Sequence, residues 1–588
     1  MRRLAFLAVV CTLAATACSS SSHSTTASST GAPSTTVASG SHVLLVGTYK
    51  GHAGPYTTIQ SAVDAAKAGD WILVAPGDYH EQYDHTVAVG QNAFGKPVAL
   101  GGVYVTTPDL HLRGMDRNTV VVDGTKPGAP QCSSAASDQD LGTVDSTGKP
   151  AGRNGVEVWK ADGGSIENLT ACNFLTGNDG GGNEIWWNGG DGSGVVGMGA
   201  YNGAYLSATS TYGTATVNGS YGIFVSNSRG PGLIVHTYAS NMSDSGYYIG
   251  ACADCNAVVD DAHAQYSALG YSGTNSGGHL IVKNSEFDQN KTGFVTNSQN
   301  NDDAPSPQDG ACPNNGVGPT GTHSCWVFED NYVHDNNNPN VPSVGAASFG
   351  WPGAGMIIAG GRDDTVINNR FVHNGSWAMN LVPYPDLATP PPVAHCVGGD
   401  TNGVPSLGLK GCYYADWGIE VAHNTFSDNG FFGNPTNGDL ADLSDPHDPA
   451  NCWHDNTDTA GITSAPADLQ QTNGTCGVSG AGAKLDISSP STLTSQLLCA
   501  SEILAPCPPK PGMNYPRLTQ IVLPALTPQP TMPDPCAGVP ANPWCTTKGP
   551  VSSTLWIPGL FGLFGLAATP PATRRLRRRT RASRVRHG

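Results

Sequence analysis

The chain has 588 residues, of which 13% are charged, and it contains 75 glycines and 43 prolines. A chain of this length can bury a sizeable core, whereas the few charged residues and many glycines and prolines exclude an architecture built mainly from Glu- and Lys-rich helices. The net charge of −17 would be −25 without the eight arginines between 574 and 586, so the acidic body excludes nucleic acid as its expected partner.

Residues 1–18 have the layout of a secretory signal peptide. Arg2 and Arg3 precede an apolar run, and the sequence AATAC ends at Cys18, as expected for an export signal. Cys18 stands where a lipobox places its lipid-modified cysteine, so lipidation at Cys18 and ordinary cleavage both remain open. Residues 19–41 consist almost entirely of Ser, Thr, Ala and Gly, which is typical of a flexible linker.

A short capping helix is predicted near the start of the folded body, within TTIQSAVDAAKAGDWILVAPGDYHE (57–81). A Thr can cap its N-terminus, and Ile59, Val63 and Ala66 fall on one helical face before Gly69 and Asp70 end it. Such a helix would shield the unpaired strand edge at the open end of a stack of strands. Strands are expected next, over 71–79 and 101–124.

Five glycines recur at a nearly constant spacing and mark a repeat. Gly199, Gly222, Gly246, Gly270 and Gly293 are 23 or 24 residues apart, and each opens a short β-rich run. A unit of this size cannot close a core alone, but stacked units can. The pattern predicts an all-β fold, a right-handed parallel β-helix with coils of about 23–24 residues, in which neighbouring strands lie about 4.8 Å apart.

A shorter skeleton supports this prediction. It reads VKNSEFDQN at 282–290, VFEDNYVHD at 327–335, VINNRFVHN at 366–374 and VAHNTFSDN at 421–429. The Val and the aromatic residue are expected to stack inside the coil, while Asn or Asp occupies the bends, because Asn tolerates left-handed backbone and its amide can bond to neighbouring coils. We interpret the skeleton as a structural ladder rather than a row of ligand-binding asparagines.

The segment 57–81 resembles the opening of pectin-methylesterase-like and pectate-lyase-like β-helix proteins. Over about 45–430 the chain resembles the broad right-handed β-helix repeat group of exported bacterial proteins, which implies the fold and leaves the activity open. The strings that surround the paired aspartates of pectin methylesterases are absent. Of the polygalacturonase-type signatures, the chain has Asp260-Asp261 and Gly278-His279, but its Asn-Thr-Asp follows at 456–458 and Arg-x-Lys is missing. No specific enzyme family is assigned.

The cysteines favour export. Apart from Cys11 and Cys18, fourteen remain, and an even number in an exported chain predicts disulfides. Zinc at Cys252 and Cys255 is disfavoured because no second CxxC or His pair accompanies them. Proximity in sequence gives the expected pairs Cys132–Cys172, Cys252–Cys255, Cys312–Cys325, Cys396–Cys412, Cys452–Cys476, Cys499–Cys507 and Cys536–Cys545.

The chain is expected to divide into a β-helix over 42–430, two insertions, and a C-terminal region. The insertions, 296–325 and 383–415, are too long for coil turns, and both groove walls and surface decoration remain open as their role. The C-terminal region is expected to consist of an irregular disulfide-containing cap (431–505), a Pro-rich stalk (506–550), an apolar membrane segment (551–568) and an Arg-rich cytoplasmic tail (569–588).

The two ends of the chain predict an envelope protein. The apolar segment 551–568 followed by arginines fits a membrane span with its positive flank inside. The alternative is a disordered basic tail that binds polyanions. We expect a monomer that is exported and held at the cell surface or membrane, through 551–568 and through a lipid if Cys18 is modified.

A local cluster of polar residues is the candidate catalytic site. A period of 24 places His236, Asp260 and Asn284 at one offset and His263 one coil from Phe287, which gathers candidate residues on adjacent coils. A lyase needs a base and a cation beside a uronate carboxylate, roles open to Lys283 or His263. Glycoside hydrolysis needs two carboxyl groups. The candidate catalytic residues are Asp260, Asp261, His263, Lys283 and Asp288.

A binding site is the other interpretation of the same coils. Tyr247, Tyr248, Tyr266 and Tyr271 could form a sugar-stacking strip with Glu286 nearby, or they could be core residues. No cofactor is certain, although acidic side chains could hold Ca²⁺. We therefore expect a protein that binds or scaffolds extracellular polysaccharide or cell-wall glycan, with a lyase or hydrolase acting on a uronate-containing polymer as the alternative.

Overall fold

The computed structural model describes residues 42–82, 101–144, 148–178, 180–300, 325–386, 396, 399, 401, 411–443, 451–476, 492–502 and 513–546. The expected signal peptide, linker, membrane segment and Arg-rich tail lie outside the described residues, as does most of both insertions. Among the helices of the described part, none is long and apolar enough to cross a membrane.

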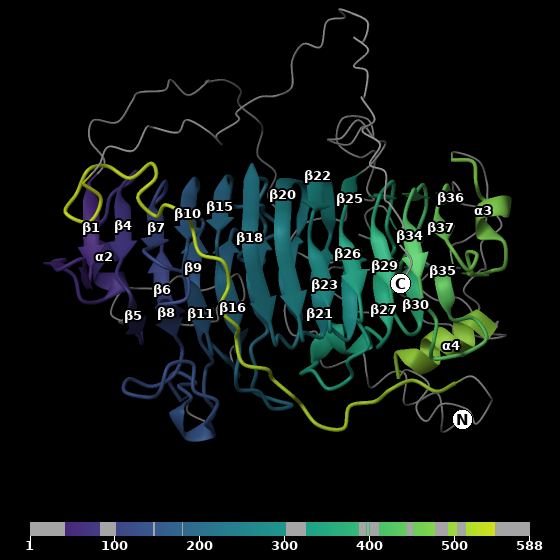
Figure 1. Cartoon of the computed structure of the whole chain (residues 1–588), viewed down its shortest axis with the longest axis horizontal. Helices are drawn as coiled ribbons and strands as arrows, with labels where there is room; N and C mark the ends of the chain where they lie inside the picture. The colour runs from purple at the N-terminus through teal and green to yellow at the C-terminus, as the bar shows by residue number, and fades with distance from the viewer. Residues whose placement is uncertain are drawn as a thin grey trace, which may run out of the picture.

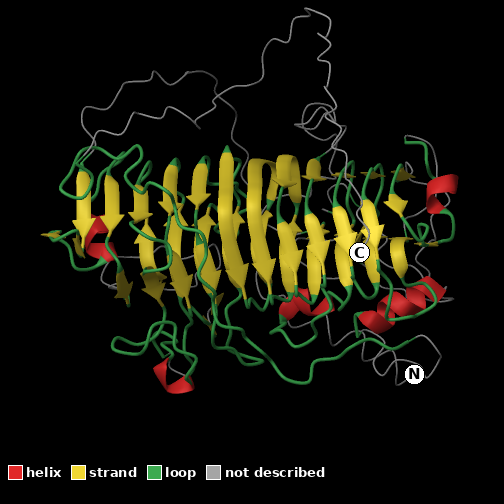
Figure 2. Ribbon diagram, in the orientation of Figure 1, coloured by secondary structure: helices red, strands yellow, loops and turns green. Residues whose placement is uncertain are grey.

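The described chain forms a right-handed parallel β-helix, as the repeat predicts (Figures 1 and 2). Each typical coil contributes two consecutive runs, called the first and second runs, to one 21-stranded sheet, and a third run to an 11-stranded sheet. In β18 and β20 the first and second runs are continuous, which joins both sets into the one sheet.

The first runs are β1 (Val43–Val46), β4 (Trp71–Val74), β7 (His111–Gly114), β10 (Gly164–Glu167), β15 (Tyr201–Ala204), β18 (Gly232–Ser240), β20 (Cys252–Gln265), β22 (Ser276–Lys283), β25 (Trp326–Glu329), β28 (Thr365–Ile367), β33 (Glu420–Ala422) and β36 (Cys452–His454). The separate second runs are β5 (Gly77–Tyr79), β8 (Val120–Asp123), β11 (Thr170–Cys172), β16 (Ser207–Thr209), β23 (Glu286–Asp288), β26 (Tyr332–His334), β29 (Arg370–Val372), β34 (Thr425–Ser427) and β37 (Thr457–Asp458).

The 11-stranded sheet consists of β6 (Gly101–Val105), β9 (Asn154–Trp159), β14 (Asn183–Asn188), β17 (Tyr221–Ser226), β19 (Ser245–Gly250), β21 (Leu269–Thr274), β24 (Thr292–Asn297), β27 (Ala354–Ala359), β30 (Trp377–Val382), β35 (Gly438–Asp442) and β38 (Ser464–Ala465). Short antiparallel pairs are β2 (Thr48–Tyr49) with β3 (His52–Ala53), β12 (Thr176–Gly177) with β13 (Gly180–Gly181), and β31 (Tyr384–Asp386) with β32 (Cys412–Tyr414). The helices are α2 (Ile59–Ala65), α3 (Leu469–Thr472) and α4 (Thr492–Ala500), with 3₁₀ turns at Ala136–Asp138 and Gly345–Phe349.

A column of glycines lets neighbouring coils of the 11-stranded sheet approach closely. Gly222, Gly246, Gly270 and Gly293 occupy equivalent positions, and a Cβ on Gly246 would lie 2.9 Å from the carbonyl oxygen of Gly270. Gly199, which the even spacing places in this column, instead precedes β15 in the other sheet. The equivalent position in β14 is Glu184, which the register of β14 with β17 aligns with Gly222.

Two ladders of buried asparagines form the bends on either side of the second runs. In the first ladder Asn331, Asn369, Asn424 and Asn456 follow one another, each Nδ2 donating to the next Oδ1 over 2.9–3.1 Å. Each amide also donates to a backbone carbonyl of the preceding coil, as Asn369 does to Phe328 over 2.9 Å. The second ladder is formed in the same way by Asn290, Asn336, Asn374 and Asn429.

The residue before each ladder asparagine has left-handed backbone, with φ of 61° at Asn368 and 54° at His373. The backbone thus turns at this residue, and the asparagine that follows bonds the coils together. The repeated skeleton is therefore a structural ladder, as predicted. One repeat needs correction, because Val282 pairs with Phe328, so the repeat at 327–335 is aligned one residue too early.

The fixed period of 24 also gives the wrong register around the candidate site. Asp260 pairs with Val235 rather than with His236, and His263 pairs with Glu286 rather than with Phe287. The reason is that the spacing from Val235 to Asp260 is 25 residues and that from Asp260 to Lys283 is 23, which average to the expected period.

Both ends of the coil are covered. Helix α2 has the predicted N-cap, Thr58, and Glu81 accepts hydrogen bonds from the first backbone amides of the helix, those of Ile59 and Gln60. At the other end the coil continues beyond the expected boundary at 430, through β35 to β38. Helix α4 packs in one apolar cluster with residues of the 11-stranded sheet, among them Ile357 and Ala441.

Residues 513–546, called the strap, lie along the coil instead of projecting from it as a stalk. The strap runs from beside α4 to β1 and β4 in Figure 1, and Trp544 near its end donates to the carbonyl of His52 over 2.9 Å. Arg117 is buried and donates to the strap carbonyl of Pro530 over 3.1 Å. Other contacts join Asn340 to Thr519, Asn241 to Pro524, Asn168 to Met532 and Arg113 to Ala537.

Disulfides staple the loops of the coil as predicted. Five of the expected pairs are present: Cys132–Cys172, Cys252–Cys255, Cys396–Cys412, Cys452–Cys476 and Cys536–Cys545. Cys325 and Cys499 are also disulfide-bonded, and their expected partners Cys312 and Cys507 lie outside the described residues. This number of disulfides indicates an exported protein.

The wall of the coil also holds ionisable groups that carry a stability cost. Glu157 is fully buried and accepts hydrogen bonds of 3.0 Å from the side-chain amides of Asn154 and Asn188. Burial raises the pKa of Glu157 to about 7, although these hydrogen bonds lower it. The folded state therefore binds the Glu157 proton more tightly than the unfolded chain does.

The first ladder predicts a large cost for Asn369→Ala. The change removes the bonds to Phe328 and Asn424 and leaves buried polar partners unpaired, each at about 1–3 kcal/mol. We expect the free energy of unfolding to fall by about 3 kcal/mol in chemical denaturation, against little change for Thr425→Ala at an exposed position of the neighbouring coil. Equal losses in the two variants would contradict the ladder.

Glu157→Gln is expected to change how stability depends on pH. A raised pKa contributes stability below about pH 4.5 that is lost as the pH rises to about 7, because the folded state must then release a tightly held proton. Between pH 4.5 and 8 the wild type should lose about 3 kcal/mol more than Glu157→Gln. Urea denaturation at both pH values measures this difference, and parallel pH profiles would be the contrary result.

Candidate functional site

The candidate site lies on the outer face of the second runs. Phe287, Val333 and Phe371 point into the core, so the residues on either side of each point outward, since side chains alternate along a strand. Stacking aligns these outward residues across four coils. The set, called the histidine–carboxylate row, comprises His263, Gln265, Glu286, Asp288, Tyr332, His334 and Arg370 with the bend residues Asp335 and His373.

One part of the row is centred on Asp288. Its Oδ1 lies 2.7 Å from Nε2 of His263, and its Oδ2 accepts a 2.7 Å hydrogen bond from the amide of Gln265. Gln265 is in turn fixed by a 3.1 Å bond from the hydroxyl of Tyr238. The Asp288 side chain is 8% exposed and that of His263 is 30% exposed, so a held carboxylate orients an imidazole that solvent can reach.

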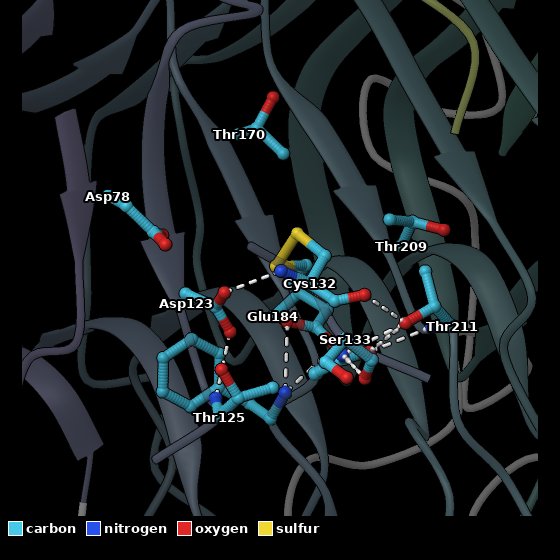
Figure 3. The surroundings of a disulfide bond; sticks show 12 residues. Asp78, Asp123, Thr125, Cys132, Ser133, Thr170, Glu184, Thr209 and Thr211 are labelled. Atoms are coloured by element: carbon cyan, nitrogen blue, oxygen red, sulfur yellow. Dashed lines mark hydrogen bonds between the residues drawn. A yellow bond between two sulfur atoms is a disulfide. The ribbon is translucent and has the colours of Figure 1, made fainter. Parts of the chain in front are cut away.

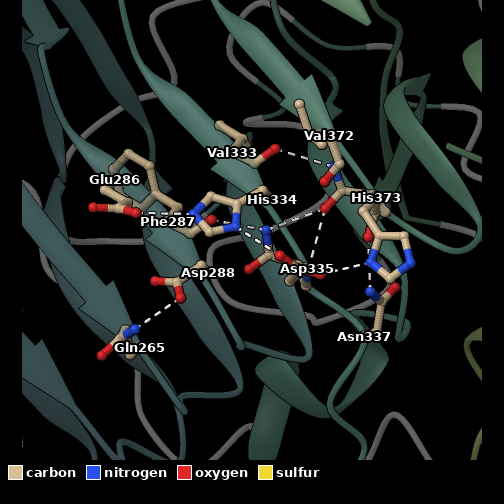
Figure 4. Close-up of polar contacts among 12 residues, drawn as sticks. Gln265, Glu286, Phe287, Asp288, Val333, His334, Asp335, Asn337, Val372 and His373 are labelled. Carbon is tan, nitrogen blue, oxygen red and sulfur yellow. Dashed lines mark hydrogen bonds and ion pairs between the residues drawn. The ribbon is translucent and has the colours of Figure 1, made fainter. Parts of the chain in front are cut away.

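The other part is a chain of alternating acids and histidines (Figure 4). Nε2 of His334 lies 2.9 Å from Glu286, Nδ1 of His334 lies 2.8 Å from Asp335, and Asp335 lies 2.5 Å from Nδ1 of His373. The bond from His334 lowers the pKa of Glu286. Burial lowers the pKa of His334, but its bonds to Glu286 and Asp335 outweigh burial and raise it above its usual value.

A cation lies beside this chain. The guanidinium of Arg370, an exposed residue, is 4.4 Å from the ring centroid of Tyr332, and that ring stacks on His334 with centroids 3.9 Å apart. The ring of Tyr332 thus links Arg370 to the acids and histidines of the row. Together the row offers an accessible imidazole, several carboxylates and a guanidinium, which can bind hydroxyls and carboxylates or transfer a proton.

The structure divides the sequence-predicted catalytic residues into two groups. His263 and Asp288 belong to the row. Asp260 and Lys283 form an ion pair of 3.6 Å on the first runs, on the other side of the bend. Asp261 has left-handed backbone at that bend and lies 2.5 Å from His236.

The predicted binding residues also separate. Tyr247 and Tyr271 are buried inside the coil, where Tyr271 stacks on Phe294, so these two are core residues. Tyr248 lies half-buried on the outer face of the 11-stranded sheet, 4.9 Å from the ring of Phe224. Tyr266 is a half-buried bend residue with left-handed backbone, and Glu286 alone of the five belongs to the row.

Sequence reasoning missed four members of the row: Tyr332, His334, Arg370 and His373. All four lie within the quoted skeletons at 327–335 and 366–374, at the variable positions between the repeated residues. Those positions point outward once the inward residues are known, so histidine and arginine at them were the available signal.

Two other groups of acids and histidines lie elsewhere. Near the Cys132–Cys172 disulfide, Asp123 is buried and accepts bonds from the backbone amides of Thr125 and Cys132 (Figure 3). Asp123 therefore holds the disulfide-bonded loop in place. The second group, His423, His454 and Asp455, lies on the last coils, with His454 3.0 Å from Asp455.

Comparisons with known proteins bear on the fold. No protein-family model and no curated protein matches the chain. Similar solved structures include the A-module of the mannuronan C-5 epimerase AlgE4 of Azotobacter vinelandii, with 12% identity, a TM-score of 0.30 and coverage of 68% of this chain and 89% of that one.

Two further structures are similar. Pectate lyase Pel9A has 12% identity and a TM-score of 0.32, over 83% of this chain and 90% of that one. The Dettilon tailspike protein has 12% identity and a TM-score of 0.37, over 69% of this chain and 64% of that one. At these levels no activity transfers to this chain.

Proposed function

We propose that the protein binds an extracellular polysaccharide along the histidine–carboxylate row. The observation that carries the proposal is the row itself, in which bonded polar side chains continue from coil to coil without interruption from His263 to His373. Successive coils are about 4.8 Å apart, so the row presents its groups at regular intervals on a rigid surface. An extended polymer of repeating units suits such a surface.

The charges of the row favour a polymer that carries both hydroxyls and carboxylates. Arg370 is an exposed donor that matches a carboxylate, whereas Glu286, Asp288 and Asp335 accept hydrogen bonds from hydroxyls. The strap contacts earlier coils through Arg113 and Arg117. A uronate-containing polysaccharide therefore satisfies both the basic and the acidic groups.

Anchoring at the cell surface is part of the proposal. The described chain begins at His42 and ends at Thr546, and both residues lie at the same end of the coil, because Val43, Trp544 and Cys545 share one apolar cluster. The row belongs to later coils. An anchor attached through either end would thus leave the row pointing away from the attachment.

Arg370→Ala is expected to weaken binding of polygalacturonate at least tenfold, because the variant loses the exposed donor for uronate carboxylates. Arg229→Ala, at another exposed arginine, is the matched control and should bind as the wild type does. Isothermal titration calorimetry with polygalacturonate and a neutral glucan measures the difference. Wild-type affinity in Arg370→Ala would count against the row as the binding surface.

A second candidate function is β-elimination of a uronate polymer. The pair of His263 and Asp288 favours it, since a carboxylate 2.7 Å away orients an accessible imidazole that can remove a proton. Arg370 would neutralise the substrate carboxylate. The electrons of the broken carbon–hydrogen bond would form a double bond as the glycosidic oxygen leaves.

If the protein is a lyase, incubation with polygalacturonate should yield shortened chains with unsaturated ends, which absorb ultraviolet light and are identified by mass spectrometry. His263→Ala should then lower the rate at least a hundredfold, through loss of a general base, while polymer binding persists. Unchanged chain length with the wild type would leave binding alone, and new reducing ends without unsaturation would indicate hydrolysis.

A further inference from the structure

Three potential metal ligands from adjacent coils converge at one point of the row. They are Nε2 of His263 and carboxylate oxygens of Glu286 and Asp288, which all lie within 4.8 Å of one another. His263 comes from β20, and both carboxylates come from β23. The register that pairs His263 with Glu286 brings the three together.

We propose that His263, Glu286 and Asp288 form a binding site for a divalent transition metal, with Zn²⁺ as the best-fitting ion. Zinc bonds of about 2.0–2.2 Å in tetrahedral geometry place neighbouring ligand atoms roughly 3.3 Å apart. Nε2 of His263 lies 2.7 Å from Asp288 and 4.0 Å from Glu286. The two distances bracket the required one, so small side-chain rotations produce the site.

Neighbouring side chains already orient the carboxylate ligands. Gln265 donates to the Asp288 oxygen that does not face His263. His334 lies 2.9 Å from Oε1 of Glu286, which leaves Oε2 toward His263, and His334 is itself held by Asp335. Contacts of this kind from outside the first ligand sphere orient ligands and raise metal affinity in known sites.

The ligand types select the metal. An imidazole with two carboxylates suits zinc and related transition metals, whereas Ca²⁺ takes six to eight oxygen ligands. Three protein ligands also leave at least one position open. Since Glu286 is 42% exposed and His263 is 30% exposed, the open position faces solvent along the row.

The second group of ligands, His423, His454 and Asp455, makes a useful contrast. His423 and Asp455 are 52% and 65% exposed, and their facing atoms are 3.9 Å apart. In the row, by comparison, Asp288 is 8% exposed and held on its second oxygen. A rigid, partly buried ligand loses less freedom on binding a metal, so the row is the stronger site.

A bound metal would deepen the proposed function, and this step rests on it. The open coordination position could accept a hydroxyl or carboxylate oxygen of the polymer, in addition to the contact with Arg370. Metal binding itself needs no polymer, so it can be measured separately.

The test is isothermal titration calorimetry of the metal-free full-length protein, purified without a histidine tag, with ZnCl₂ and separately with CaCl₂. We expect one zinc ion per chain with micromolar or tighter affinity, and weaker binding of calcium. Glu286→Gln and Asp288→Asn should each weaken zinc binding at least tenfold, while His454→Ala at the contrasting group should leave it unchanged.

Unchanged zinc affinity in Glu286→Gln would overturn the site, and it remains a valid test because this exposed side chain is not needed for folding. Loss of zinc binding in His454→Ala alone would move the site to the last coils and overturn the proposal. Tighter binding of calcium than of zinc would overturn the choice of metal class. Titration of polygalacturonate with and without zinc then tests the proposed function independently of metal affinity.

Discussion

Parallel hydrogen bonding between successive coils, held in register by buried asparagine bends, is the constraint on which the rest of the molecule depends. Asn369 bonds to side chains of the coils before and after it and to a backbone carbonyl. Because these groups are buried, a shift of one residue would leave several of them unpaired, at about 1–3 kcal/mol each. The core then follows, since the same register stacks Tyr271 on Phe294.

The candidate site is a consequence of this register rather than of any local motif. His263, Glu286 and His334 are separated by 23 and 48 residues in sequence, yet neighbouring coils bring them into contact. The row needs no cleft, because the outer face of a coil repeats its side-chain positions at a fixed spacing. Its chemistry depends on which residue occupies each outward position.

The strap illustrates a different use of hydrogen bonds. A Pro-rich segment has few amide donors for a sheet, so residues 513–546 contact the coil largely through their carbonyls. Buried arginines supply the donors, as Arg117 does for Pro530. Burial lowers the pKa of Arg117 to about 10, which leaves it charged at neutral pH and able to donate to these carbonyls.

Much of the fold could be predicted from the sequence. The spacing of Gly246, Gly270 and Gly293 predicts coils because interior packing repeats where glycine is required. Thr58 and the local cysteine pairs gave α2 and the observed disulfides for the same reason, since both depend on residues close in sequence. The strap was predicted as a stalk, because composition indicates an extended chain but not what it contacts.

The site was less predictable. An average period cannot reveal that one coil has 25 residues between Val235 and Asp260 while the next has 23 between Asp260 and Lys283. This one-residue difference decides whether His263 faces Phe287 or Glu286. His334 was missed because a long insertion separates its coil from the preceding one, which interrupts the period that would align them.

The central claim is that the polymer-binding surface is the outer face of the second runs. Hydrogen exchange measured by mass spectrometry, with and without a saturating uronate polysaccharide, tests it directly. The account predicts that exchange slows in peptides covering β23, β26 and β29 and the bends that follow them. Slower exchange confined to the outer face of the 11-stranded sheet, around Trp186 and Tyr248, would contradict it.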